Sequence, residues 1–396
     1  MDLTLPRMRD DAVIRRFDGG DHAAQYVVAI DGRHFIASES VAALLEMTRH
    51  SPSLAALAQS MSGRFGRSFT VAELESALRN RIPAVFFRSD EPSAAHDPLQ
   101  LRARLLDGAL LLPALRATST LFARGVVVPL VCLFLLLDAL VGAHIVRHGL
   151  AQSGEASVVG AMSLVLAGIA AHELGHLSAC HRYGAAHGGI GVGLYWFLPV
   201  FYAEVHGAWL LSKAERAVVD IAGIYFQCLF LLTVAAVWLV HPSATLLLAL
   251  WASHFLVLST LNPVLKYDGY WLLSDLSGRH NLHQQMRESA RSCWRKLMRR
   301  ADAFWPSARD RMLLGMFGVL AFAYFGYVLY FMAHNLAFAC SRIMVDQAGW
   351  SRAATALGLL LTIAFVLGVT GMLARAIRDV IEVAPKQNSG GHRGSP

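Results

Sequence analysis

Charged residues are scarce in this sequence. Of its 396 residues only 16% are Asp, Glu, Lys or Arg, whereas 55% are hydrophobic, and the mean hydropathy is +0.44. Because a soluble domain carries roughly a quarter charged residues, this composition indicates an integral membrane protein. The net charge of +7 is not gathered into a basic motif interleaved with aromatic residues. We therefore expect a lipid bilayer as a partner and no nucleic acid.

The sequence also lacks paired cysteines and a signal peptide. No C-x-x-C pair is present, which argues against a disulfide scaffold and against a zinc site built from thiolates. The five cysteines are Cys132, Cys180, Cys228, Cys293 and Cys340. The first residues, MDLTLPRMRDDAVIRRF, contain no apolar core of the kind that a signal peptide needs. We expect this end of the chain to stay in the cytoplasm.

Residues 1–90 have the composition of a small soluble domain. The stretch AQYVVAIDGRHFIAS predicts two strands joined by a turn at Asp31-Gly32. Three helices are predicted to follow, with N-caps at Ser38, Ser51 and either Ser68 or Thr70. The pattern is typical of an α+β module of winged-helix character.

The rest of the chain predicts a mostly α-helical, polytopic membrane protein. Residues 91–124 are interpreted as a linker and an arginine-containing apolar segment at the membrane interface. Six apolar stretches approach the length of about 20 residues that a membrane span needs; they lie near 126–146, 157–178, 217–240, 245–262, 312–333 and 354–374. The predicted parts are a core of four spans at 125–275, a basic cytoplasmic loop at 276–311, two further spans at 312–380 and a polar tail at 381–396.

Lysine and arginine are unevenly distributed among the loops. They gather before the first span, between the second and third, between the fourth and fifth, and after the sixth. The opposite loops contain few. Because positively charged loops stay on the cytoplasmic side, we expect a multi-pass protein of the cell membrane with both termini in the cytoplasm.

The stretch AHELGHLSACHRYG, residues 171–184, places ionisable side chains in an apolar helix. His172 and His176 are four residues apart, so their imidazoles share one helix face and can hold one metal ion. Glu173 completes H-E-x-x-H, in which the glutamate is a base for water rather than a ligand. The motif can arise by chance in a histidine-rich chain. A charged side chain inside a membrane costs roughly 3 kcal/mol or more, however, and we therefore interpret the stretch as a zinc site.

A catalytic zinc ion needs a third protein ligand and an open position. Asp268, in the stretch NPVLKYDG after the fourth span, is expected at the same membrane depth as the two histidines, because the second and fourth spans both run toward the cytoplasm. Proline and glycine open the helix there, which suits a ligand that reaches into the protein. His206 and His254 are the alternative ligands.

Two further features lie in or between the spans. Residues 188–209 are rich in glycine and then in aromatic residues. They are interpreted either as extended backbone that pairs with a substrate peptide or as an interfacial aromatic belt. Asp138, in the first span, is expected to face the helix bundle or to pair with His144.

H-E-L-G-H on one span together with N-P-x-x-x-x-D-G on a later one resembles the site-2 protease family of intramembrane zinc metalloproteases. The resemblance implies a zinc ion held by His172, His176 and Asp268. It also implies that Glu173 is the general base that activates water.

The second motif carries a further implication. Asn262 matches an asparagine of the family that helps to hold the substrate or the oxyanion. The sequence departs from the family in having Leu265 and Lys266 in a motif that often contains a second proline. The family also implies a location in the bacterial inner membrane.

The first domain resembles a PqqD-like peptide-recognition element over the stretch from YVVAIDGRHFIAS to ALRNRI. Such elements bind the leader peptides of ribosomally made, modified peptides, usually by strand addition. Ser38 stands where an asparagine often starts the first helix. Joined to a zinc-protease core, the module resembles proteins of peptide-maturation and export clusters.

Together the two resemblances predict an intramembrane zinc metalloendopeptidase that hydrolyses a membrane-associated or ribosomally made precursor peptide. One alternative is a regulated intramembrane protease that acts on a membrane-anchored regulator. The other is a non-proteolytic export or immunity partner that uses the metal structurally.

Overall fold

The computed structural model of the chain describes residues 5–17, 25–31, 33–87, 99–148, 156–195, 198–278 and scattered positions between 282 and 330. The chain divides into two units, Met1–Arg279 and His280–Pro396. In the second unit an apolar helix covers Gly315–Tyr327, inside the span predicted at 312–333. The span predicted at 354–374, the tail at 381–396 and most of the loop at 276–311 lie outside the described residues.

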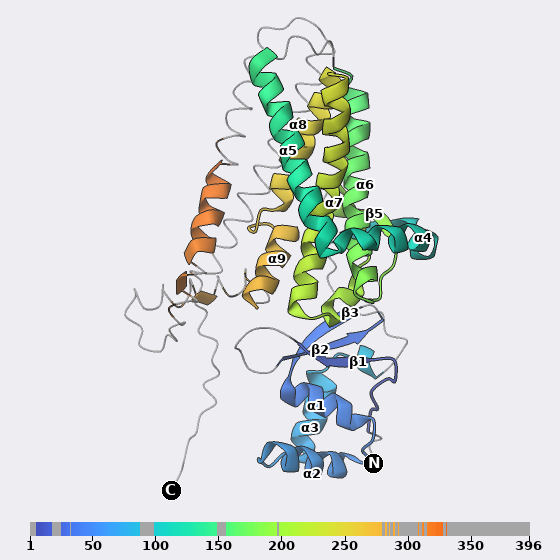
Figure 1. Cartoon of the computed structure of the whole chain (residues 1–396). Helices are drawn as coiled ribbons and strands as arrows, with labels where there is room; N and C mark the ends of the chain where they lie inside the picture. The colour runs from blue at the N-terminus through green and yellow to red at the C-terminus, as the bar shows by residue number, and fades with distance from the viewer. Residues whose placement is uncertain are drawn as a thin grey trace, which may run out of the picture. The chain divides into compact units, whose positions relative to one another are not determined.

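An antiparallel sheet and three helices form the N-terminal module (Figure 1). The elements are β1 (Val13–Arg16), β2 (Gln25–Ile30), β3 (Arg33–Ser38), α1 (Glu39–Thr48), α2 (Leu54–Phe65) and α3 (Val71–Asn80). The predicted hairpin is present, because β2 pairs with β3. The sheet order is β1-β2-β3; the four-residue β1 was not predicted, since so short a stretch carries little periodic pattern.

Polar side chains fix where two of the helices begin. The hydroxyl of Ser38 accepts a hydrogen bond from the backbone of Val41 at 3.4 Å, as its prediction as an N-cap requires. Of the two caps considered for α3, the structure uses Thr70 and not Ser68. Thr70 and Glu73 form a reciprocal capping box, which satisfies two backbone donors that a helix start leaves open.

The predicted start of α2 is wrong. Ser51 lies beyond the end of α1, and its backbone N–H donates to the carbonyl of Met47 in the last turn of that helix at 3.0 Å. Ser53 caps α2 instead. The helix ends at Gly66, whose φ of 63° lies in the left-handed region that favours glycine.

A second antiparallel sheet joins two segments that are far apart in the sequence. Its strands are β4 (Leu99–Leu106), β5 (Ile190–Tyr195) and β6 (Leu198–Ala203), in the order β4-β5-β6. The Nη2 atom of Arg104 lies 2.8 Å from a carboxylate oxygen of Glu204 just beyond β6. Strands from the linker and interfacial segment predicted at 91–124 and from the glycine- and aromatic-rich stretch at 188–209 therefore form one sheet.

The remaining helices form the apolar part of the chain. They are α4 (Gly108–Thr118), α5 (Arg124–His148), α6 (Val158–Arg182), α7 (Lys213–Val240), α8 (Ala244–Thr260) and α9 (Asp268–Ser277). Among the described residues, α5, α6 and α7 are long and apolar enough to cross a membrane, and α8 is a shorter apolar helix of 17 residues. The total of six spans stays a prediction.

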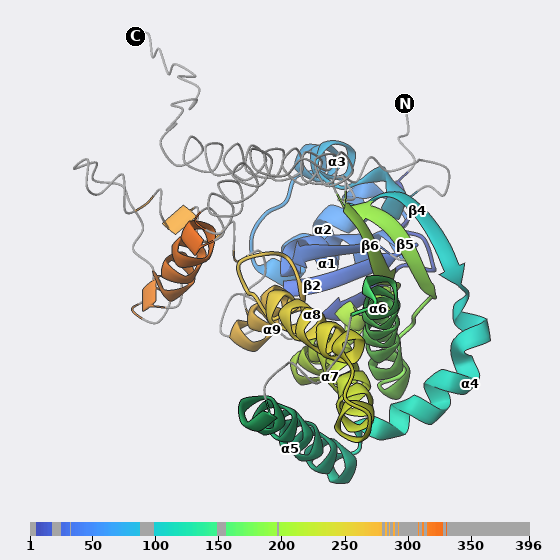
Figure 2. The ribbon, with the colours of Figure 1, turned by 90° about the horizontal axis from the view of Figure 1, so that it is seen from above.

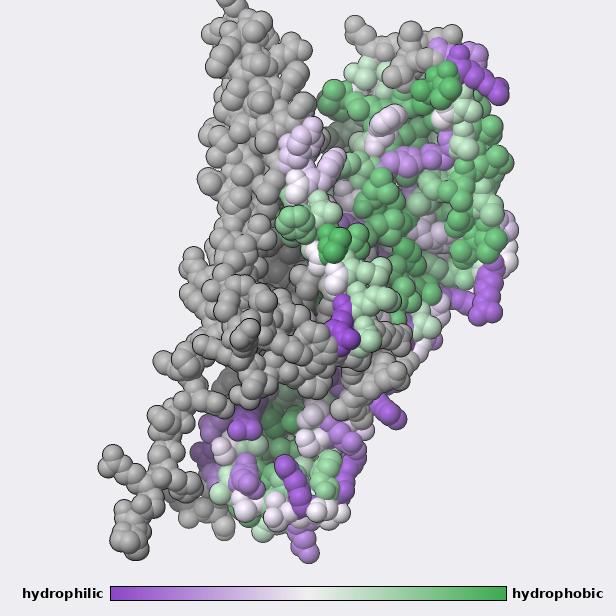
Figure 3. All heavy atoms as spheres, turned by 90° about the vertical axis from the view of Figure 1, so that its left-hand side faces the viewer, coloured by the Kyte–Doolittle hydropathy of each residue, from purple (hydrophilic) through white to green (hydrophobic). Residues whose placement is uncertain are grey.

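The long helices pack side by side. Figures 1 and 2 show α6, α7 and α8 lying together, with α5 against α7. Trp238 and Leu231 are buried between them, whereas Val146, Phe255 and Leu258 are exposed. Hydrophobic side chains gather over the outer faces of these helices (Figure 3). An apolar surface of this kind suits contact with lipid.

The N-terminal module contacts a short 3-10 helix, η4 (His206–Leu210), that precedes α7. The ring of Trp209 stacks on His34 with centroids 5.9 Å apart and lies 6.5 Å from the ring of Phe17. Arg15 donates to the carbonyl of Leu210 at 3.3 Å. The module is thereby fixed beside the segment that leads into α7.

Candidate metal centre

Two histidines of α6 face each other across one helical turn. The imidazoles of His172 and His176 have their centroids 4.8 Å apart, and their Nε2 atoms are separated by 3.1 Å. Both side chains are largely enclosed, with 9% and 12% of their surface exposed. The spacing of four residues in an uninterrupted helix therefore produces the pairing that the sequence predicted.

Asp268 is the third member of the group, and it comes from a different helix than the two histidines. Its Oδ2 atom lies 3.0 Å from the Nε2 of His172 and 3.5 Å from the Nε2 of His176. Asp268 is the first residue of α9. Gly269 makes this position possible, since a Cβ there would lie 2.0 Å from the carbonyl oxygen of Leu261. The chain after α8 thus folds back on itself and directs the carboxylate toward α6.

Helix α7 holds the outer nitrogens of both histidines. The Nδ1 of His172 lies 3.3 Å from the Oε1 of Gln227, and the Nδ1 of His176 lies 2.7 Å from the carbonyl oxygen of Val219. A metal-binding imidazole commonly donates its second N–H in this way, which fixes the tautomer and the ring orientation. Sequence reasoning missed both partners. A glutamine within the apolar stretch 217–240 was the signal that the sequence offered for one of them, and the structure leaves only 1% of it exposed.

The three side chains fit a zinc ion. Around a tetrahedral zinc with ligands at about 2.0–2.1 Å, donor atoms lie about 3.3 Å apart, close to the separations found here. The Oδ2 of Asp268 is buried and makes no geometrically sound hydrogen bond, so the contact with the imidazoles is better suited to a shared cation. Among the described residues, His172, His176 and Asp268 form the group of side chains suited to a metal ion.

Gly223 of α7 leaves the space that the ion would need. A Cβ at this position would lie 2.4 Å from the Nε2 of His176 and 2.5 Å from the Nε2 of His172. Any side chain would therefore crowd the two nitrogens that point toward the carboxylate.

The electrostatic environment of Asp268 keeps its carboxyl group in the charged form that can act as a metal ligand. Burial acts to raise the pKa of its carboxyl group, but His176 and His172 lower it by more, and the net pKa lies below the ordinary value. The group remains an ionised carboxylate, which is the form that binds a metal.

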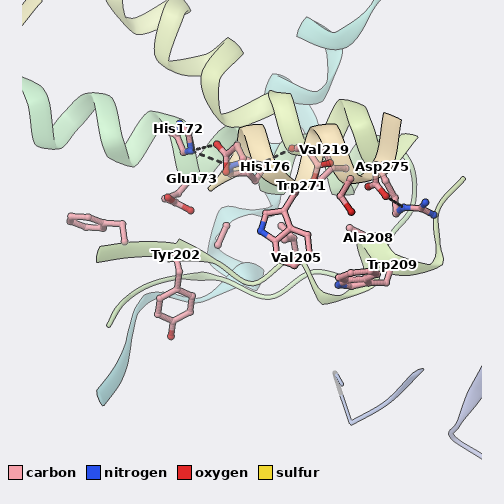
Figure 4. A pocket seen from close by; sticks show the side chains of 16 residues that line it. His172, Glu173, His176, Tyr202, Val205, Ala208, Trp209, Val219, Trp271 and Asp275 are labelled. Carbon is pink, nitrogen blue, oxygen red and sulfur yellow. Dashed lines mark hydrogen bonds and ion pairs between the residues drawn. The ribbon is translucent and has the colours of Figure 1, made fainter. Parts of the chain in front are cut away.

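The metal group opens into a cavity of about 380 Å³. Its lining comes from α6, β6, η4, α7 and α9, and includes Glu173, Phe201, Tyr202, Ala203, Trp209, Arg216, Asp220, Trp271, Ser274 and Asp275. Glu173 is 8% exposed and its carboxylate interacts with the backbone of Ala203 in β6. Figure 4 shows Glu173 pointing away from the imidazole of His172, toward the strand that carries Tyr202.

Charged side chains also lie at the other end of the cavity. The Nε atom of Arg216 donates to Asp275 at 2.9 Å, and both side chains are mostly buried. In Figure 4, His172 and Asp275 stand at opposite ends of the labelled residues. Sequence reasoning did not single out this pair. Neither residue belongs to a motif in the sequence.

The other residues singled out in the sequence lie elsewhere. Asn262 is not among the residues that line the cavity, and its Oδ1 accepts a hydrogen bond from the backbone of Val264 at 2.9 Å. His206 lies near His34 of the N-terminal module. Neither His206 nor His254 belongs to the metal group.

Of the two alternatives for Asp138, the structure agrees with contact to the helix bundle and not with pairing to His144. Asp138 lies 3.1 Å from the Nε2 of His254 on α8, whereas His144 packs against Trp238 with ring centroids 5.2 Å apart. The sequence pattern suggested His144, which lies on the same helix as Asp138. Helix packing instead places His254 of α8 next to it.

The chain is similar to one named protein of Bacillus subtilis (strain 168), "Putative peptide zinc metalloprotease protein YydH". The two are 28% identical over 107 residues, which cover 26% of this chain and 42% of that protein. The match thus spans less than half the length of this relative. No family model matches the chain, and no solved structure matches it. The name of this relative supports zinc metalloprotease activity and no finer assignment.

Proposed function

We propose that the chain is an intramembrane zinc metalloprotease that hydrolyses a peptide bond of a membrane-associated or ribosomally made precursor peptide. One observation carries this proposal. His172, His176 and Asp268 converge with donor atoms 3.0–3.5 Å apart at a cavity that also contains Glu173. The name of the bacterial relative supports the same chemistry.

His172, His176 and Asp268 would hold the metal, and Gln227 and the Val219 carbonyl would orient the imidazoles. A bound zinc ion supplies Lewis acidity toward a carbonyl oxygen and toward water. Glu173 would take a proton from the attacking water and return it to the departing amine. Its buried position beside the metal ligands allows this proton transfer without exchange with bulk solvent.

The second sheet supports a binding mode for the substrate. In the described sheet β6 is an edge strand, and Phe201, Tyr202 and Ala203 of β6 line the cavity. An extended peptide that pairs with this edge would lie along the cavity with its backbone exposed to the metal centre. This requires an unwound substrate, since a helical backbone shields its carbonyl groups.

The N-terminal module is proposed to bind the leader of the precursor. A hollow of about 440 Å³ lies beside β1 and α1, lined by residues such as Ile14, Tyr26, Glu39 and Arg49. Because β1 and β3 are the edges of the described sheet, each could accept an added strand. Binding of a candidate leader by the purified chain, and its loss when residues 1–95 are deleted, would test this role.

The protein is further proposed to span the cell membrane several times with both termini in the cytoplasm. Three helices long enough to cross a bilayer support this location. The uneven distribution of lysine and arginine supports the orientation.

Glu173→Gln tests the proposed chemistry. The variant should bind zinc as the wild type does but lose cleavage by a factor of about 10²–10⁴, because a general base is removed while the ligands stay. The measurement is mass spectrometry of short peptide precursors encoded beside the gene, incubated with zinc-loaded protein in lipid nanodiscs, together with elemental analysis of zinc.

Glu288→Gln, an exposed position that lines neither the cavity of the metal group nor the hollow of the N-terminal module, is the matched control and should cleave normally. Cleavage by Glu173→Gln at the wild-type rate would show that the base is assigned wrongly. Zinc bound by the wild type without cleavage of any precursor would favour a non-proteolytic export or immunity partner.

A further inference from the structure

One end of the cavity is lined by one arginine, Arg216, and two aspartates, Asp220 and Asp275. Arg216, 4% exposed, donates to Asp275 at 2.9 Å and to the carbonyl of Leu211 at 3.0 Å. Its guanidinium also lies over the ring of Phe17 at 4.1 Å. The arginine is therefore already engaged with one carboxylate and with the protein around it.

Asp220 is the second carboxylate at this end of the cavity. It stands one helical turn after Arg216 on α7 and lines the cavity with Asp275. Its carboxyl group is hydrogen-bonded to the carboxyl group of Asp275, whereas its Oδ2 atom is buried and has no hydrogen-bond partner. Among the described residues that line the cavity, Arg216 is the permanent cation, and its ion pair is with Asp275. Lys213 acts on Asp275 more weakly, and it does not line the cavity.

An enclosed carboxylate oxygen without a partner is costly. A ligand that brings a positively charged donor would remove that cost. Without such a ligand, the hydrogen bond between Asp220 and Asp275 requires a proton shared by the two carboxyl groups. A positively charged donor would take the place of that proton, whereas a site that keeps the proton would show no preference for charge.

The walls beside these carboxylates favour an organic cation. Trp209 and Trp271 both line the cavity, with ring centroids 5.8 Å apart and planes at 84°. Indole faces attract ammonium and guanidinium groups, and they also pack against the aliphatic stem that carries such a group. A second metal ion is a poorer fit, because Asp220 and Asp275 are not part of a metal-type group among the described residues.

We propose that this end of the cavity is a subsite for a lysine or arginine side chain of the substrate peptide, with Asp220 as the carboxylate that recognises it. The subsite and the metal centre share one cavity. The recognised residue would therefore lie close to the scissile bond. This inference rests on the proposed function and adds a substrate class to it.

Peptide hydroxamates that differ in one side chain test the subsite without cleavage. The hydroxamate group binds zinc, and the side chain is lysine, norleucine or glycine. Calorimetric titration of zinc-loaded full-length protein in nanodiscs should give at least about tenfold tighter binding of the lysyl compound than of the norleucyl one, as expected for a charge-assisted hydrogen bond. Asp220→Asn should abolish this preference, and Asp220→Glu should keep part of it.

Asp10→Asn, which removes one exposed carboxylate from the N-terminal module, is the matched control and should keep the preference. Equal affinities for the lysyl and norleucyl compounds in the wild type would overturn the subsite, and so would a preference that persists in Asp220→Asn. Unchanged binding of the glycyl compound verifies that each variant is folded and metal-loaded.

The same titrations separate the subsite from the proposed function. Binding of the glycyl compound without side-chain preference contradicts the subsite alone. A lysyl preference in a protein that cleaves no precursor contradicts proteolysis and supports the subsite. A glycyl compound that fails to bind counts against the metal centre and therefore against both.

Discussion

Gly223 is the residue on which the closeness of α6 and α7 depends at the metal centre. The helix face that carries it must approach the Nε2 atoms of both histidines, and no side chain other than a hydrogen atom fits. A neighbouring glycine on α6, Gly175, shows the same closeness, since a Cβ there would lie 2.4 Å from the carbonyl oxygen of Ala222. Small residues at such crossings are a common means of packing membrane helices.

Gly223→Ala should therefore lose zinc. The added methyl group would lie about where the ion and its open position are needed, so the zinc content measured by elemental analysis should fall well below one per chain. Gly142→Ala is the control, because a Cβ at Gly142 of α5 meets nothing within 4 Å. If Gly223→Ala kept full zinc, the ion would have to be bound away from the three proposed ligands.

At the scale of single elements, α3 offers a direct test of its N-cap. Thr70→Ala removes one half of the capping box with Glu73, at a cost of about 1 kcal/mol. We expect the amides of α3 to exchange about fivefold faster with deuterium in the full-length protein. Ser68→Ala should leave this rate unchanged, because Ser68 does not cap the helix.

The contact between the sheet of the module and η4 should depend on pH. Burial, and to a lesser degree the charge of His206, lowers the pKa of His34 from 6.5 to about 4. The docked imidazole is thus neutral, whereas the undocked one binds a proton below about pH 6.5. The contact keeps its full stability above that pH and loses it as the pH falls toward 4.

Thermal unfolding of the wild type and of His34→Gln at pH 7.5 and pH 5 measures this effect. The wild type should lose more stability than the variant over this interval, since glutamine does not titrate. Equal losses in the two proteins would show that His34 is protonated as easily in the docked state as in the unfolded one.

Local patterns predicted much of the fold. The hairpin, the caps Ser38 and Thr70, and the ends of four apolar helices to within four residues all follow from neighbours in sequence. Ser53 was missed in favour of Ser51, because the extent of the last turn of α1 depends on packing. The sheet formed by β4 and β5 could not be predicted, since its partners are far apart in the sequence.

In the candidate site, too, some features follow from the local sequence and others depend on tertiary packing. The pairing of His172 with His176 depends on helix geometry alone, and a reading of membrane depth identified Asp268. The contacts of Gln227, Val219 and Asp220 depend on how α7 lies against α6 and α9. That packing of α7 cannot be derived from a single sequence.

At the scale of the whole molecule, the apolar helices and the polar module require different surroundings. The exposed faces of α5 and α8 are hydrophobic, whereas the surface of the module carries ion pairs such as those of Arg9 with Asp11 and Asp31. A bilayer around the helices, with the module in water, satisfies both surfaces.

Cysteine labelling tests the proposed orientation. In a background without the five natural cysteines, a cysteine in place of Pro242, which is exposed between α7 and α8, should react with a membrane-impermeant maleimide in intact cells. A cysteine in place of Ser68, which is exposed in the N-terminal module, should react only after the membrane is opened. Reversed reactivity of the two positions would show that the orientation drawn from lysine and arginine is wrong.

Asp268 belongs to α9, and the histidines that it meets belong to α6. A metal ion held by all three would therefore act as a cross-link between distant parts of the chain, and its binding free energy would add to the free energy of folding. Each tenfold rise in free zinc above the dissociation constant would stabilise the native state by about 1.4 kcal/mol. Depletion of free zinc would then lower the stability of the native state as well as the occupancy of the site.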